Sequence, residues 1–190
     1  MQLFHGSRTG GIEILEPRQA DHDRPYVYMT TNRIVALFYL CNAVEKPYYW
    51  FPYGFNPDGV PVYHELYPNA LREVSEGVSG YIYEADADES QVIPFKNIPV
   101  ARLATEPIAV SDCTPVEDAY TLLMEYVRRG ELVIDRYEDK TPEQLQWWYK
   151  GLCGELKRKN MKDIPDCSYA RFVQKKLPAV WAMYLQSEEQ

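Results

Sequence analysis

Three residue types that can act together on a ligand stand at separate places along this chain. His5 ends a short apolar run and is followed by Gly6 and Ser7, which places an imidazole beside bare main chain and a hydroxyl group. A glycine lets a ligand approach the backbone closely. Tyr28 lies two residues before a turn, and Glu106 opens a later apolar run. A histidine beside bare main chain suits ligand binding, and aromatic rings suit a planar, partly polar ligand.

The carboxylate has rivals within the chain. Asp86, Asp88 and Glu89 follow the strand expected at residues 80–85, and they remain alternatives to Glu106 as the third residue of the site. Four other polar or aromatic residues are expected to lie in surface loops or in helix packing: His22, His64, Trp147 and Trp148.

Short strands are predicted to position the candidate residues. Residues 2–5 are expected to form a strand that runs into a turn at Gly6, and residues 26–30 are rich in aromatic and β-branched side chains typical of a strand. A buried helix is predicted over 34–40, with Thr31 or Asn32 as its N-cap.

The middle of the chain is also predicted to form mainly β-strands. A hairpin is expected from strands at 48–51 and 60–63, because the sequence Asn-Pro-Asp-Gly at 56–59 is turn chemistry. Residues 66–75 predict a short helix or an irregular connection. Further strands are predicted, in chain order, at 80–85, 91–94, 100–103 and 107–110.

Helices are predicted beyond that point. The pair Thr114–Pro115 is expected to start a helix that ends at Gly130, and Thr141–Pro142 repeats the same start pattern. A last helical region is expected over 168–185, interrupted at Pro178. These patterns divide the chain into a sheet-rich core, 1–112, and a helical extension, 113–190, packed on it.

The three separated motifs resemble those of one enzyme superfamily. The run Leu-Phe-His-Gly-Ser-Arg-Thr at 3–9 resembles the nicotinamide-binding segment of poly(ADP-ribose) polymerases and their relatives. The run Val-Tyr-Met-Thr at 27–30 is similar to the second motif, and Tyr39 falls eleven residues after Tyr28, where the family has a second stacking tyrosine. The run at 105–110 resembles the third motif, and resembles even more closely a Glu-Pro-Leu segment of small bacterial rifampin ADP-ribosyltransferases.

The resemblance implies a role for each residue. His5 is expected to donate hydrogen bonds to ribose hydroxyls, and Gly6 to present its main-chain N–H and C=O to the nicotinamide amide. Ser7 adds a hydroxyl to that amide, and Arg8 is expected to reach the adenosine side or a phosphate. Tyr28 and Tyr39 would stack on the nicotinamide ring, and Glu106 would stabilise the oxocarbenium-like ribose as nicotinamide leaves.

Composition excludes several other classes. A formal net charge of −8 argues against a duplex nucleic-acid footprint. The four cysteines form no CxxC pair and have no histidine at ligand spacing, so no metal is expected, and we interpret them as reduced in a cytoplasmic setting. Neither a signal peptide nor a membrane-spanning helix is expected.

The resemblance implies an α+β fold with split antiparallel sheets around an NAD cleft. The implied function is an NAD-dependent mono-ADP-ribosyltransferase, with NAD as co-substrate and a protein, nucleic acid or small molecule as acceptor. Two alternatives stay open: a catalytically silent NAD-fold interaction module, and an RNA 2′-phosphotransferase-like enzyme, which the negative charge disfavours.

Overall fold

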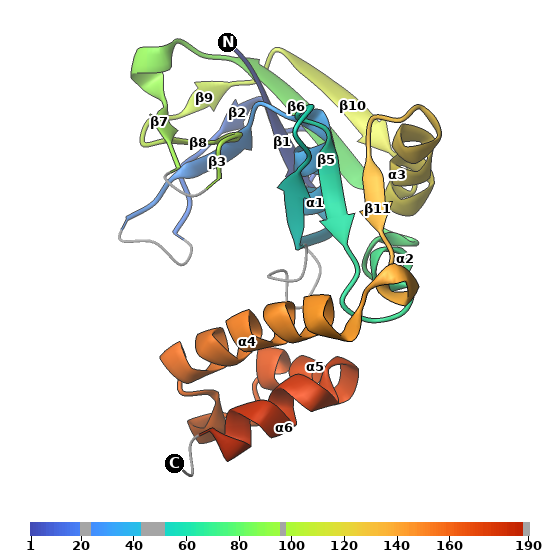
Figure 1. The fold of residues 1–190 in the computed structure, drawn as a ribbon. Helices are drawn as coiled ribbons and strands as arrows, with labels where there is room; N and C mark the ends of the chain where they lie inside the picture. The colour runs from blue at the N-terminus through green and yellow to red at the C-terminus, as the bar shows by residue number, and fades with distance from the viewer. Residues whose placement is uncertain (20–23, 43–51, 96–97, 188–190) are drawn as a thin grey trace. The chain divides into compact units, whose positions relative to one another are not determined.

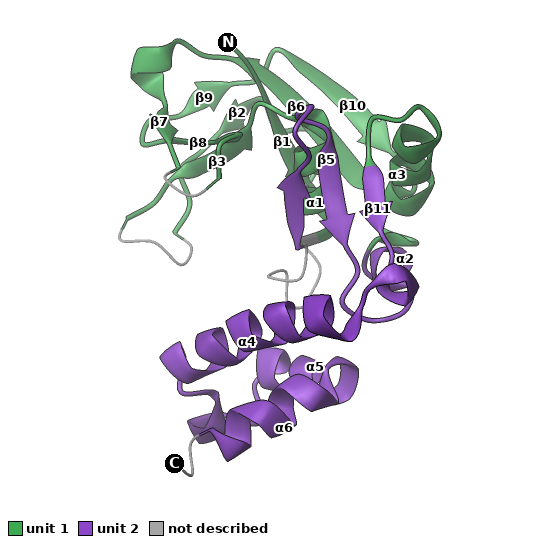
Figure 2. Ribbon diagram, viewed as in Figure 1, with its two compact units in different colours: residues 1–43, 75–132 green, residues 44–74, 133–190 purple. Residues whose placement is uncertain are grey.

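A computed structural model describes residues 1–19, 24–42, 52–95 and 98–187 of the chain. Helices are combined with sheets whose strands are mostly antiparallel, so the expected α+β class is confirmed at this level. The chain forms two compact units, each built from two stretches of sequence (Figure 2). Unit 1 comprises Met1–Ala43 and Ser75–Leu132, and unit 2 comprises Val44–Val74 and Val133–Gln190.

Unit 1 is built on a sheet whose neighbouring strands all run antiparallel (Figure 1). Its strand order is β10 (Asp112–Val116), β6 (Gly80–Asp86), β1 (Gln2–Ser7), β3 (Val27–Thr30), β8 (Ala101–Ala104) and β7 (Ile93–Pro94). A two-stranded sheet pairs β2 (Ile14–Leu15) with β9 (Ile108–Ala109). The strands expected near 2–5, 26–30, 80–85 and 100–103 are confirmed. Gly6 and Ser7 continue β1 instead of forming a turn.

Helix α1 (Arg33–Asn42) covers one face of this sheet. The side-chain oxygen of Asn32 accepts from the main-chain N–H groups of Ile34 and Val35, at 2.9 and 3.1 Å, so Asn32 is the N-cap. A Cβ atom at Gly6 would lie 2.1 Å from the carbonyl oxygen of Ala36, so only glycine allows α1 to pack this closely on β1.

A continuous apolar cluster fills the opposite face of the sheet. Leu3, Val27 and Met29 from the large sheet pack there with Leu15 and Ile108 from the β2–β9 pair. Side chains alternate between the two faces of a strand. His5 and Ser7 therefore share the face of Leu3, whereas Tyr28 leaves β3 on the face that α1 covers.

The helix predicted to start at Thr114–Pro115 begins later, so that prediction is wrong. Residues 112–116 form edge strand β10, where a proline costs no ladder hydrogen bond if its nitrogen faces outward. Helix α3 (Ala119–Arg128) starts after Asp118, whose side chain accepts from the N–H of Thr121 at 2.7 Å. The predicted end is confirmed, because Gly130 follows with a φ of +74°.

Unit 2 contains a three-stranded sheet in which β5 (Pro61–His64) lies between β4 (Tyr53–Phe55) and β11 (Val133–Asp135). β4 and β5 form a hairpin around the predicted turn, whose Asn56 side chain accepts from the N–H of Val60 at 2.8 Å. The strand expected at 48–51 lies outside the described residues. β11 runs parallel to β5.

The remaining helices belong to the later part of the chain, apart from the short α2 (Ala70–Ser75) and η2 (Glu89–Gln91). Helix α4 (Pro142–Arg158) starts at the predicted Thr141 cap, and Gln144 completes a capping box. The helical region broken at Pro178 is also observed. Its elements are η3 (Tyr137–Asp139), η4 (Met161–Asp163), α5 (Ser168–Lys176) and α6 (Pro178–Gln186).

The two compact units do not follow the expected division at residue 112. Strand β10 pairs with β6 across five residue pairs, which keeps residues 112–116 and the following helix α3 in unit 1. The segment 44–74 groups with the C-terminal helices because β5 pairs with β11. Among the described residues, no helix is long and apolar enough to cross a membrane.

Candidate functional site

Strands β1 and β3 separate from each other where the candidate residues lie. β1 pairs with β6 along its whole length, from Gln2 opposite Asp86 to Ser7 opposite Tyr81. With β3 it shares the pair Phe4–Thr30, and no further pair joins these two strands within the described residues. Beyond Phe4 the strands therefore leave a gap, and His5, Gly6 and Ser7 form its β1 side.

The hydrogen-bonding pattern shows which groups of β1 face this gap. The carbonyl oxygen of Glu84 on β6 accepts from Ser111 at 2.8 Å on the β10 side, so the main chain of Glu84 faces away from β1. Its partner Phe4 must then direct its own N–H and C=O toward β3. Because this direction alternates along a strand, the N–H and C=O of Gly6 also point toward β3, into the gap.

The carbonyl group of Tyr28 enters the gap from the other side. The N–H of Thr31 donates to Val100 at 2.9 Å on the β8 side. Alternation along the strand therefore turns the carbonyl of Tyr28 toward β1. There it accepts a hydrogen bond from Nδ1 of His5 at 2.7 Å, across 23 residues of sequence.

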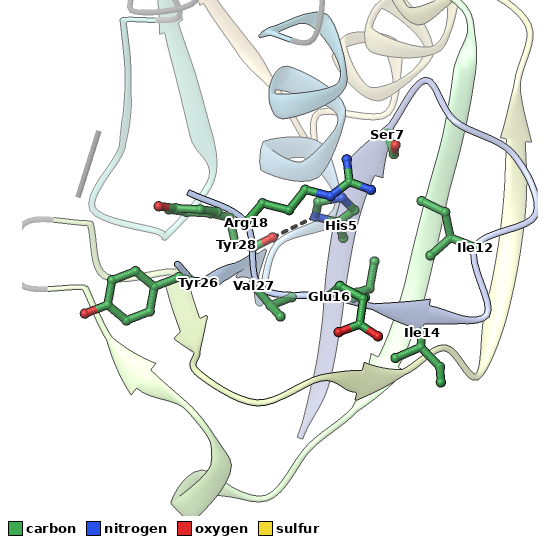
Figure 3. A pocket seen from close by; sticks show the side chains of 10 residues that line it. His5, Ser7, Ile12, Ile14, Glu16, Arg18, Tyr26, Val27 and Tyr28 are labelled. Carbon is green, nitrogen blue, oxygen red and sulfur yellow. Dashed lines mark hydrogen bonds between the residues drawn. The ribbon is translucent and has the colours of Figure 1, made fainter. Parts of the chain in front are cut away.

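This bond determines the state of the imidazole. A carbonyl oxygen can only accept, so Nδ1 of His5 carries the proton. Burial lowers the pKa of His5 below 6.5; the hydrogen bond to Tyr28 opposes this, and the positive charge of Arg18 adds to the lowering. Figure 3 shows the Arg18 side chain running beside the ring. With Nδ1 engaged at Tyr28, a neutral His5 has its Nε2 lone pair left as an acceptor. The expected hydrogen bonding of the ring to ribose hydroxyls stays a prediction.

A small pocket opens at the gap, with a volume of about 80 Å³ (Figure 3). Binding sites for whole small molecules usually measure roughly 300–1,000 Å³, so only one part of a dinucleotide fits inside. Four of its lining residues are aliphatic, and the others carry polar groups. The lining residues are His5, Ser7, Ile12, Ile14, Leu15, Glu16, Arg18, Tyr26, Val27 and Tyr28.

The wall that contains Ile12 is held by a buried tyrosine on β6. The hydroxyl of Tyr83 donates to the carbonyl of Thr9 at 2.7 Å and accepts from the N–H of Ile12 at 3.3 Å. Gly10 lies against the ring of Tyr81, where an added Cβ would come within 3.0 Å of ring atoms. The segment between β1 and β2 is therefore fixed at two points beside the pocket.

Three of the predicted ligand-binding residues, Gly6, Arg8 and Tyr39, are not among the residues that line this pocket. Arg8 is exposed at the end of β1. Tyr39 is half-buried on α1, which lies on the face from which the Tyr28 side chain leaves β3. The stacking of Tyr28 and Tyr39 on a ligand remains a prediction.

Glu106 is exposed in the bend between β8 and β9, and it is not among the lining residues. Its neighbours in the chain nevertheless pair with residues that line the pocket. Two residues before it, Ala104 pairs with Val27, and two residues after it, Ile108 pairs with Leu15. Both partners, Val27 and Leu15, line the pocket.

The carboxylate that does line the pocket is Glu16, which the sequence analysis missed. Glu16 opens a polar, proline-containing segment, and nothing in its local pattern distinguishes it from a surface loop residue. Pairings with distant residues hold its segment at the pocket: Leu15 pairs with Ile108, and Arg18 pairs with Tyr26.

The rival carboxylates lie elsewhere in unit 1. Asp86 is exposed opposite Gln2, at the end of β1 remote from Ser7. Asp88 and Glu89 belong to the start of η2, where the N–H of Asp88 donates to the Gln91 side chain at 2.8 Å. None of the three lines the pocket.

Of the other two histidines, His22 lies outside the described residues. His64 was expected in a surface loop, but it ends β5 and is half-buried. Its Nδ1 lies 2.7 Å from a carboxylate oxygen of Asp135, and its ring lies 5.1 Å from that of Trp148. The expected packing role of Trp148 is consistent with this contact, whereas Trp147 is 69% exposed.

Comparison of the chain with models of known protein families, with curated proteins and with solved structures found no match. The case for a function therefore depends on the residues around the gap between β1 and β3.

Proposed function

We propose that this chain is an NAD-dependent mono-ADP-ribosyltransferase with an ADP-ribosyltransferase-like fold in unit 1. The observation that carries the proposal is the gap between β1 and β3, which has Gly6 on one side and His5 bonded to the Tyr28 carbonyl across it. NAD would be the co-substrate, and its nicotinamide end would enter this gap.

The gap is suited to a flat amide. The nicotinamide amide has one acceptor oxygen and two N–H donors, which match the N–H and C=O that Gly6 directs away from β6. Ser7 lies one residue further along β1 and lines the pocket, so its hydroxyl would add a contact to the same amide. The ladder of β1 and β3 stops at Phe4–Thr30, so a ligand can take the place of a strand partner here.

The side chains around the gap would hold the rest of the nicotinamide riboside. Nε2 of His5 would accept a hydrogen bond from a ribose hydroxyl, since Nδ1 is engaged with Tyr28. The ring of Tyr28 would stack on the nicotinamide, with Tyr39 as the second ring on the side of α1. Arg8, exposed at the end of β1, would reach a phosphate or the adenosine end.

Glu106 would supply the negative charge that the reaction needs. When nicotinamide leaves, the ribose C1′ becomes oxocarbenium-like, and a nearby carboxylate stabilises it. The leaving nitrogen already carries positive charge, so no general acid is required. The position of Glu106, between the partners of Val27 and Leu15, supports this assignment over Asp86, Asp88 and Glu89.

The test is incubation of the full chain with NAD and measurement of free nicotinamide by chromatography. We expect wild-type protein to release nicotinamide, and Glu106→Gln to release it on the order of 100-fold more slowly while keeping its affinity for NAD. The matched control is Glu13→Gln, an exposed carboxylate of unit 1 that does not line the pocket, and Glu89→Gln tests the rival assignment.

Two results would count against the proposal. Wild-type rates from Glu106→Gln would remove Glu106 from the mechanism. If the wild-type chain binds NAD without releasing nicotinamide, it is an interaction module and not a transferase.

A further inference from the structure

Glu16 stands out among the ten described residues that line the pocket, because it brings a carboxylate to a wall that is otherwise aliphatic or neutral apart from Arg18. Figure 3 shows it on the side of the pocket formed by Val27 and Ile14, away from the His5 ring. A carboxylate there is within the site but separate from the groups assigned to nicotinamide.

The register of the small sheet brings Glu16 and Glu106 to the same end of one ladder. Leu15 of β2 pairs with Ile108 of β9. Glu16 follows Leu15 in the chain, and Glu106 and Pro107 come directly before Ile108, so both glutamates lie beyond the same end of the paired strands. The bend that carries Glu106 therefore lies beside the segment that carries Glu16, 90 positions earlier in the chain.

We propose that Glu16 is the general base that takes the proton of the acceptor. This inference rests on the proposed function. In the step, the bond between ribose C1′ and the nicotinamide nitrogen breaks, and its electron pair leaves with nicotinamide. A bond forms between C1′ and the acceptor oxygen, whose proton passes to the Glu16 carboxylate and then to solvent.

The other polar lining groups fit this role less well. A proton taken by His5 would create a second cation beside Arg18 and next to the positive ribose, whereas a proton taken by a carboxylate removes charge. The hydroxyls of Ser7 and Tyr26 are poor proton acceptors near neutral pH. Glu16 then accepts the proton of the acceptor, and Glu106 stabilises the ribose cation.

Sodium azide separates these two roles. Azide is already anionic and needs no base, whereas water must lose a proton as it attacks. The experiment incubates wild-type protein and the variants Glu16→Gln, Glu106→Gln and Glu13→Gln with NAD, with and without azide. Nicotinamide, ADP-ribose and ADP-ribosyl azide are quantified by chromatography, and NAD binding is measured by calorimetry.

We expect Glu16→Gln to form ADP-ribose about 100-fold or more slowly than wild type, because general-base catalysis contributes roughly 10²–10⁴-fold. Added azide should restore its nicotinamide release and shift its products strongly to ADP-ribosyl azide. Glu106→Gln should remain slow with both nucleophiles. Glu13→Gln is the matched control, since Glu13 is exposed on the same segment and does not line the pocket.

Wild-type hydrolysis by Glu16→Gln would overturn the inference. A Glu16→Gln variant that binds NAD normally but stays inactive with azide would also overturn it, because Glu16 would then act on bond cleavage. Absence of nicotinamide release from the wild-type chain would instead refute the proposed function, so the two failures are distinguishable.

Discussion

Asp118 provides a direct test of the architecture of unit 1. One oxygen of its carboxylate accepts from the N–H of Thr121 at 2.7 Å, which caps α3. The other accepts from the N–H of Gly77 at 2.6 Å, which links α3 to a segment 41 residues earlier. The substitution Asp118→Ala removes both bonds without disturbing the apolar core.

The expected cost follows from these two bonds. Replacing an N-cap by alanine costs about 1 kcal/mol. A hydrogen bond to a charged acceptor contributes roughly 1.5–3 kcal/mol, which we reduce to about 1 kcal/mol because this bond is exposed. The sum is about 2 kcal/mol. For a chain of 190 residues this lowers the melting temperature by about 4–8 °C.

The assay is thermal and urea unfolding of the wild type and three variants. Asp118→Asn should lose about 1 kcal/mol, because its side-chain oxygen caps the helix but its amide cannot accept from Gly77. Thr114→Ala, at the position where the sequence alone predicted the cap, should change stability by less than about 0.5 kcal/mol. A cost of about 2 kcal/mol for Thr114→Ala with no cost for Asp118→Ala would refute Asp118 as the cap of α3.

The effect should also depend on pH. Burial alone would raise the pKa of Asp118, but the hydrogen bonds from Thr121 and Gly77 outweigh it and lower the pKa below 3.8. The stabilisation is therefore complete above about pH 4 and is lost as the pH falls through the lowered pKa. The difference between wild type and Asp118→Ala should shrink over that range.

Three further predictions concern the site. Gly6→Ala should destabilise the chain by about 1–3 kcal/mol or more, measured by urea unfolding, because its Cβ would overlap the Ala36 carbonyl; Gly151→Ala, where nothing lies within 4 Å of the added Cβ, is the control. The His5 ring should titrate below pH 6.5 by NMR, because burial and Arg18 lower its pKa. The folded state then loses stability as the pH falls below 6.5, because the unfolded chain takes up the proton first. A measured His5 pKa above 6.5 would contradict this prediction. Tyr28→Ala should weaken NAD binding, measured by calorimetry, by roughly 1–3 kcal/mol, and unchanged affinity would argue against stacking.

Local features predicted local structure well. Asn32 and Thr141 cap helices because a side-chain oxygen beside the first turn needs no distant partner. The turn at 56–59 formed for the same reason, since its hydrogen bonds lie within five residues. The strands that carry His5 and Tyr28 were likewise visible in their composition.

The predictions were wrong where two local sequence patterns favoured different structures, or where pairing with a distant strand determined the structure. Thr114 and Pro115 resemble a helix start, but residues 112–116 pair with β6 instead. Asp118 caps the helix, and its carboxylate accepts from the N–H groups of both Thr121 and Gly77. Gly6 was expected to break the strand, but it continues β1 because Gly6 and Ser7 pair with Ile82 and Tyr81 of β6.

The sequence by itself determined the types and order of the candidate residues, from His5 through Tyr28 to Glu106, together with the strands that carry the first two. Only the tertiary structure decided that β1 and β3 separate after one pair, and that Glu16 lines the pocket while Glu106 is exposed in the bend between β8 and β9. The reason is that strand register depends on contacts between residues far apart in the chain. Local composition does not encode which of two exposed glutamates such a register will bring to the site.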